Sequence, residues 1–139
     1  MKTFIVMVLA VVLSSCQSTG LKIGNLDVGR LVNQGVKLWD ANNIDQEQEI
    51  QLGQNISAVL LGVRPLHQNQ AINQYVNKVG LWLALHSSRP DLPWHFGVID
   101  SDAINAFAAP GGFVFITSAM LQQLNSEAEL AAVLAHEIS

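Results

Sequence analysis

The sequence of 139 residues has few cationic side chains and a single cysteine, and both shortages exclude classes of protein. Seven lysine and arginine residues stand against eleven aspartate and glutamate residues, for a net charge of −4, and no basic cluster is present. Since nucleic-acid binding depends on clustered cations that neutralise phosphates, we expect no nucleic-acid partner. One cysteine excludes an intrachain disulfide. Half of the residues are apolar, which predicts a folded chain of one domain at most.

The N-terminal segment has the pattern of a bacterial export signal. Phe4–Leu13 is an unbroken apolar run, too short for the roughly 20 residues of a membrane-spanning helix but long enough for a signal-peptide core. The small residues Ser14 and Ser15 then precede Cys16, so the segment resembles a lipobox. We therefore expect residues 1–15 to be a signal peptide and Cys16 to be the lipid attachment site. The alternative is an ordinary secretory signal that contains an unmodified cysteine.

Lipidation would decide where the protein resides. Several acyl chains on one cysteine anchor a protein stably without a membrane-spanning helix. Gln17 follows Cys16, and the resemblance to lipoproteins implies outer-membrane sorting because this position is not aspartate. We expect an exported protein that is lipid-anchored to the bacterial outer membrane on its periplasmic side. Residues 16–44 are polar and contain many glycines and asparagines, which predicts an N-terminal tether before a folded part at residues 45–139.

The hydrophobic spacing of residues 45–139 predicts an α+β fold. Apolar residues recur every three or four positions in three segments, which predicts helices at residues 45–63, from residue 70 and at residues 118–124. Apolar, branched and aromatic runs predict short strands at residues 94–99, 104–108 and 113–117. Turn residues separate the last two strands, which indicates a β-hairpin. Ser126 and Glu129 have the spacing of a capping box and predict the start of a final helix.

The final predicted helix ends in His136 and Glu137, the pair that begins the H-E-x-x-H motif of zinc peptidases. In that motif two histidines four residues apart lie on one helix face and bind the same zinc ion. The glutamate reaches the metal-bound water as a general base. Ile138 and Ser139 occupy the two x positions. The pair alone is a weak signal, and the alternative is a solvated helix end.

Several longer blocks strengthen the zinc-peptidase interpretation. They read Y-V-N-K-V-G at residues 75–80, R-P-D-L-P-W at 89–94, N-A-F-A-A-P-G-G at 105–112 and E-L-A-A-V-L-A-H-E-I-S at 129–139. With these blocks, residues 45–139 resemble the opening part of the bacterial lipoprotein branch of peptidase family M48. These proteins are HtpX-like gluzincin metalloendopeptidases.

The resemblance implies a fold and a set of site residues. The fold would be the N-terminal portion of a zincin-like α+β domain, with helices packed against a small sheet that contains the hairpin. The chain would end in the first part of the active-site helix. His136 would be a zinc ligand and Glu137 the general base, with one zinc ion in each complete domain. An edge strand would hold an extended peptide substrate through backbone hydrogen bonds; this strand would consist of Phe113, Val114, Phe115, Ile116 and Thr117.

Two functions remain open at this point. The second histidine of the motif and the glutamate ligand of the family are absent from the sequence, whereas catalytic zinc needs three protein ligands. We therefore expect a truncated, inactive fragment of a lipid-anchored zinc metalloendopeptidase, unable to bind zinc tightly. The complete enzyme would act on protein or peptide substrates in envelope protein quality control. The alternative is a non-catalytic membrane-tethered lipoprotein that binds unfolded or partner proteins.

Overall fold

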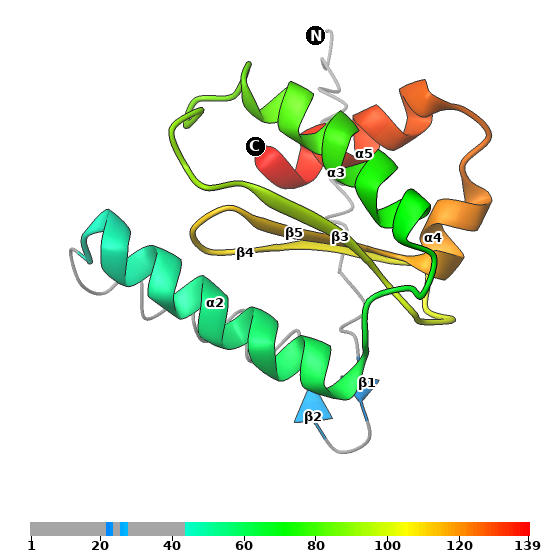
Figure 1. Cartoon of the computed structure of the whole chain (residues 1–139), viewed down its shortest axis with the longest axis horizontal. Coiled ribbons are helices and arrows are strands. Elements are labelled where there is room, and N and C mark those ends of the chain that lie inside the picture. Colours follow the sequence, from blue (N-terminus) through cyan, green and yellow to red (C-terminus); the bar gives the residue numbers. More distant parts are fainter. Residues whose placement is uncertain (1–21, 24–25, 28–43) are drawn as a thin grey trace, which may run out of the picture.

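The computed structural model of the chain describes residues 22–23, 26–27 and 44–139 (Figure 1). The expected signal peptide, Cys16 and most of the expected tether lie outside the described residues. Among the described residues, no helix combines the length and the apolar character needed to cross a membrane. The elements are β1 (Lys22–Ile23), β2 (Leu26–Asp27), α2 (Gln46–Val63), α3 (Gln70–Ala84), β3 (His95–Ile99), β4 (Ala106–Ala109), β5 (Phe113–Thr117), α4 (Ser118–Gln123) and α5 (Glu127–Ile138).

The elements from α2 onward form three layers, which confirms the α+β prediction. A sheet with the strand order β3-β5-β4 lies between α2 on one face and α3 with α5 on the other (Figure 1). The predicted hairpin is confirmed because β4 and β5 pair antiparallel, with Ala109 opposite Phe113. β3 pairs parallel to β5, and the connection between these two strands contains β4.

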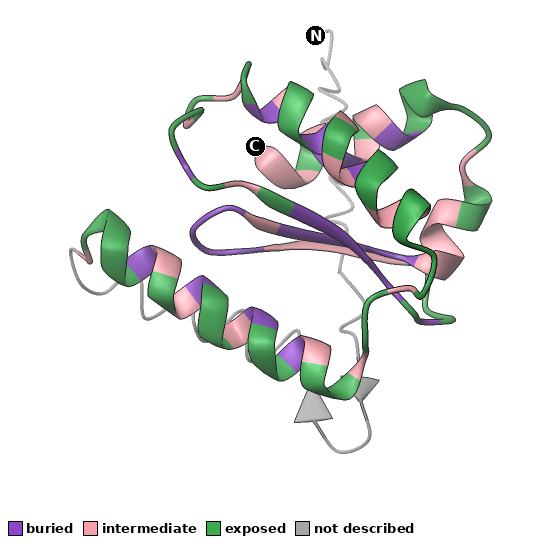
Figure 2. Cartoon of the chain, viewed as in Figure 1, coloured by how far each residue is buried: buried purple, intermediate pink, exposed green. Residues whose placement is uncertain are grey.

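Alternating side chains of β5 divide the core into two parts. Val114 and Ile116 lie in the cluster that α3 and α5 cover, whereas Phe115 packs with Leu60 of α2 and Ile99 of β3. This division follows from the two-residue period of a strand, which sends successive side chains to opposite faces. Both faces of the sheet are therefore covered, and buried residues run along it (Figure 2).

The strand Phe113–Thr117 is not an edge strand, and that part of the sequence-based prediction is wrong. β5 pairs with β3 on one side and with β4 on the other, so its backbone N–H and C=O groups are used within the sheet. The apolar run of β5 identifies a strand but does not reveal how many neighbours it has. Within the described part of the chain, the strands at the two edges are β3 and β4.

Side chains of α3 close the outer side of β3. The Asn73 and Asn77 Oδ1 atoms accept hydrogen bonds from the backbone N–H groups of Val98 at 2.9 Å and Phe96 at 3.0 Å. The His67 N–H donates to the Val98 C=O at 2.8 Å. Since an exposed edge is a template for pairing with another chain, these contacts prevent β3 from accepting an extended peptide.

We expect the Asn77→Ala variant to lower the free energy of unfolding by roughly 1–2 kcal/mol, because the Phe96 N–H loses its acceptor away from water. Urea-induced unfolding measures this change. Asn77→Asp is the matched control because it keeps an oxygen at the same position, and its loss should be smaller. Equal losses in the two variants would contradict the assigned role of the Asn77 oxygen.

Candidate active site

Helix α5 holds His136 and Glu137 in its last turn. The helix begins where the Ser126 Oγ accepts a hydrogen bond from the Glu129 N–H at 3.2 Å. The Glu129 carboxylate accepts from the N–H of residue 125 rather than from that of Ser126, so the predicted capping box forms only in part. Leu130 and Leu134, one helical turn apart, are buried at 2% and 0% exposure. These two leucines fix the rotation of α5 and hence the directions of His136 and Glu137.

Glu137 lies beside strand β4. Helix α5 packs against β4, and the Glu137 side chain is half-buried there, whereas His136 is exposed. Burial raises the pKa of Glu137 above its ordinary value, although the neighbouring His136 and the backbone of Ala108 act in the opposite direction. A general base works best when its pKa is near the working pH, so this environment favours the role predicted for Glu137.

The outer side of β4 faces away from the sheet with free backbone groups. The Thr117 N–H donates to the Asn105 C=O at 3.0 Å, so these two residues form a hydrogen-bonded pair. Antiparallel pairs alternate along a ladder, and the register places Ala106 and Ala108 at the positions whose N–H and C=O groups point outward. Within the described residues, no strand pairs with this side. Glu137 thus adjoins an edge that can accept an extended peptide.

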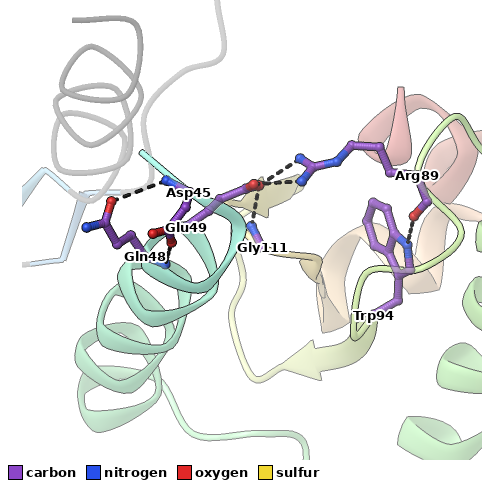
Figure 3. A network of polar contacts seen from close by, with 6 residues as sticks. All are labelled: Asp45, Gln48, Glu49, Arg89, Trp94 and Gly111. Atoms are coloured by element: carbon purple, nitrogen blue, oxygen red, sulfur yellow. Dashed lines mark hydrogen bonds and ion pairs between the residues drawn. The ribbon is translucent and has the colours of Figure 1, made fainter. Parts of the chain in front are cut away.

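A buried ion pair, not anticipated from the sequence, lies at the other end of β4 (Figure 3). Glu49 of α2 is 4% exposed. Its carboxylate accepts two hydrogen bonds from the Arg89 guanidinium, at 2.9 and 2.7 Å. It also accepts one from the N–H of Gly111, in the turn between β4 and β5, at 2.9 Å. The sequence offered only weak signals for this contact, since a glutamate in the first turn of a helix is common at the surface.

Stability should depend on the charge of Glu49. Burial opposes ionisation, but the Arg89 and Gly111 hydrogen bonds outweigh it and lower the pKa of Glu49 below its ordinary value. A lowered pKa in the folded state stabilises the fold above about pH 4.3, the ordinary glutamate pKa, and this stabilisation is lost as the pH falls through the folded-state pKa.

We expect Glu49→Gln to unfold at lower urea concentration than the unchanged protein at neutral pH, and the difference to shrink in acid. Urea unfolding measured at about pH 7 and about pH 3 tests this dependence. Glu47→Gln is the matched control, because Glu47 is exposed in the same first turn of α2. A difference between Glu49→Gln and the unchanged protein that stays constant with pH would contradict the assignment.

His136 is the residue that the sequence predicts as a zinc ligand. An imidazole such as that of His136 is a suitable ligand for zinc. Among residues 22–23, 26–27 and 44–139, however, no group of three or more His, Cys, Asp or Glu side chains could hold a metal ion. Since catalytic zinc takes three protein ligands, His136 fits as one ligand and the described residues do not complete the set.

The fold and the site together define a class. Helix α5 ends in a His-Glu pair and packs on a small sheet beside the free edge of an antiparallel strand. This is the arrangement of a zincin-like metallopeptidase domain. The family model described as Peptidase family M48 matches residues 70–139. The chain belongs to this family.

The similar proteins include several that are named as proteases. The Beta-barrel assembly-enhancing protease of Escherichia coli K12 is 41% identical over 92 residues, which cover 66% of this chain and 19% of that protein. The protein of the same name in Yersinia pestis is 38% identical over 93 residues, covering 67% and 19%. The Mitochondrial metalloendopeptidase OMA1 of Schizosaccharomyces pombe is 40% identical over 76 residues, covering 55% and 23%. The chain spans about one fifth of the length of these relatives.

Proposed function

We propose that the full-length protein is a zinc-dependent metalloendopeptidase, in which this chain supplies the substrate-binding edge, one zinc ligand and the general base. The observation that carries the proposal is the position of the half-buried Glu137 on α5, which packs against β4, the strand with a free edge. Membership of Peptidase family M48 supports the reaction class.

Strand β4 binds the peptide substrate, and Glu137 transfers the protons of the reaction. The outward N–H and C=O groups of Ala106 and Ala108 pair with an extended substrate, which fixes the position of its backbone along the edge. Glu137 lies next to that backbone and takes a proton from the attacking water, then delivers it to the leaving amine. Zinc, when bound, lowers the pKa of its water and polarises the substrate carbonyl.

His136 is the zinc ligand that this chain contributes. Two more ligands are needed, and we place them in residues of the full-length protein outside the described part, as in the family pattern. Residues 1–139 alone are accordingly proposed to be inactive and to bind zinc weakly. The exposed position of His136 supports this arrangement, because its imidazole is free to meet ligands from another segment.

The site of action is proposed to be the envelope. The lipobox-like segment before Cys16 supports a lipid anchor on the periplasmic side of the outer membrane. The enterobacterial relatives are named for enhancing β-barrel assembly, and β-barrels are the membrane-spanning proteins of outer membranes. Together these features favour protein substrates and a role in envelope protein quality control.

We expect His136→Ala to remove stoichiometric zinc from the full-length protein and to abolish peptide hydrolysis. Catalytic zinc with one of its three protein ligands removed binds far more weakly. Elemental analysis of the purified protein, together with hydrolysis of an unfolded protein, measures both effects. His86→Ala is the matched control, since His86 is an exposed histidine just beyond α3. Full zinc content in His136→Ala would contradict the proposal.

The free edge of β4 also suits a second function, the binding of unfolded or partner proteins without hydrolysis. That function predicts binding that is unchanged by a metal chelator and by His136→Ala, with no cleavage by the full-length protein. The two functions therefore give opposite results in the same experiment.

A further inference from the structure

Among the described residues, Glu49 is the one charged residue that is buried. It has no chemical role in the proposed reaction and contacts neither His136 nor Glu137. The side chain reaches from the first turn of α2 to two other segments (Figure 3). Arg89 belongs to the connection between α3 and β3, and Gly111 belongs to the turn between β4 and β5. Glu49 therefore joins three segments that are far apart in the sequence.

The Arg89 side of this contact is itself anchored. The indole Nε1 of Trp94 donates a hydrogen bond to the Arg89 C=O at 2.9 Å, which fixes the backbone of the arginine just before β3 (Figure 3). The Arg89 side chain as a whole is 40% exposed, whereas the Glu49 side chain is 6% exposed. The carboxylate is thus bound by an arginine whose backbone is hydrogen-bonded to Trp94, and it presents an oxygen to Gly111.

The turn between β4 and β5 is pressed directly against α2. Gly111 has a φ of +73°, and a Cβ on it would lie 2.5 Å from the Cα of Ile50. A Cβ on Gly53 of α2 would lie 1.8 Å from the Pro110 oxygen. Only glycines allow two backbones to approach so closely. The Glu49 hydrogen bond to the Gly111 N–H fixes the turn at this contact.

The position of the turn determines the direction of β4. Ala108 precedes Gly111 by three residues, and β4 has a strand neighbour on one side only within the described residues. We propose that Glu49 is a positioning residue, which holds the β4–β5 turn so that the outward backbone groups of Ala106 and Ala108 stay aligned beside Glu137. This inference rests on the proposed peptidase function.

We expect the effect on substrate binding to depend on the length of the side chain at position 49. Glu49→Asp keeps the charge but shortens the side chain, so its carboxylate draws back from Gly111. Glu49→Gln loses the charge but keeps an oxygen at the same reach. Since α5 packs on the opposite face of the sheet from α2, neither variant should displace His136 or Glu137, and kcat should change little.

The experiment measures steady-state hydrolysis of an extended, unstructured peptide by the full-length zinc-loaded protein. We expect Glu49→Asp to raise KM about 10-fold, as for the loss of one charge-assisted hydrogen bond. We expect Glu49→Gln to keep KM within about threefold of the unchanged protein while lowering its stability. Glu47→Asp and Glu47→Gln are the matched controls in the same helical turn, and both should leave KM unchanged.

The outcomes separate this inference from the function on which it rests. Unchanged KM in Glu49→Asp, or changes of KM that follow the loss of stability in both variants, would overturn the positioning role alone. Absence of hydrolysis by the unchanged full-length protein would overturn the peptidase function and the positioning role with it. A raised KM in Glu49→Asp with a nearly unchanged KM in Glu49→Gln would support both.

Discussion

Glu137→Gln is expected to lower kcat for peptide hydrolysis by about 10²–10⁴-fold in the full-length protein, the usual contribution of a general base. Glutamine has nearly the same shape and fits the same half-buried position beside β4. It cannot take a proton from water, so the loss falls on the chemical step. Steady-state kinetics with an unstructured peptide measure kcat, and elemental analysis measures zinc in the same preparation.

The zinc content distinguishes loss of the base from loss of the metal. Glu137→Gln should keep zinc, because Glu137 is proposed to act on the water and not to bind the metal. Glu47→Gln removes the same charge from an exposed position and should keep full activity. Substantial hydrolysis by Glu137→Gln, or a loss of zinc from it, would contradict the role assigned to Glu137.

Leu134→Ala is expected to lower the free energy of unfolding by about 2–5 kcal/mol. The Leu134 side chain is fully buried in the cluster that α3, α5 and the sheet share. Truncation of Leu134 leaves a cavity next to the helical turn that contains His136 and Glu137. A loss of this size is a large part of the roughly 5–15 kcal/mol that stabilise a typical domain, so the midpoint of thermal unfolding should fall clearly.

An exposed leucine provides the control for this substitution. Leu85, at the end of α3, is 67% exposed, and Leu85→Ala should change stability by less than about 0.5 kcal/mol. Thermal and urea unfolding of both variants measure the difference. Similar stabilities for Leu134→Ala and Leu85→Ala would show that α5 does not pack on the sheet as described.

The helices and strands of residues 45–139 were predictable because each is encoded locally. Hydrophobic spacing placed the helices now seen as α2, α3 and α4, and the turn chemistry before Phe113 placed the hairpin. The order of the strands was not predictable in the same way. The parallel pairing of β3 with β5 joins residues 18 positions apart, such as His95 and Phe113, and no local pattern specifies that neighbour.

The same distinction applies to the site. The His136–Glu137 pair was visible as a motif, whereas the strand beside it was misassigned, because β5 and β4 are both short and apolar. The free edge became evident only from the register, which turns Ala106 and Ala108 outward. Glu49 was missed because its partners lie 40 and 62 residues away in the sequence.

The proposed function requires an extended peptide to bind along the outer edge of β4 beside Glu137. Backbone amide exchange in the full-length Glu137→Gln protein, with and without an unstructured peptide, tests it most directly. We expect slower exchange of the β4 amides, above all that of Ala106, and no change at Phe96 and Val98 of β3, whose N–H groups already bond to α3. Protection of β3 with no change in β4 would contradict peptide binding at the β4 edge.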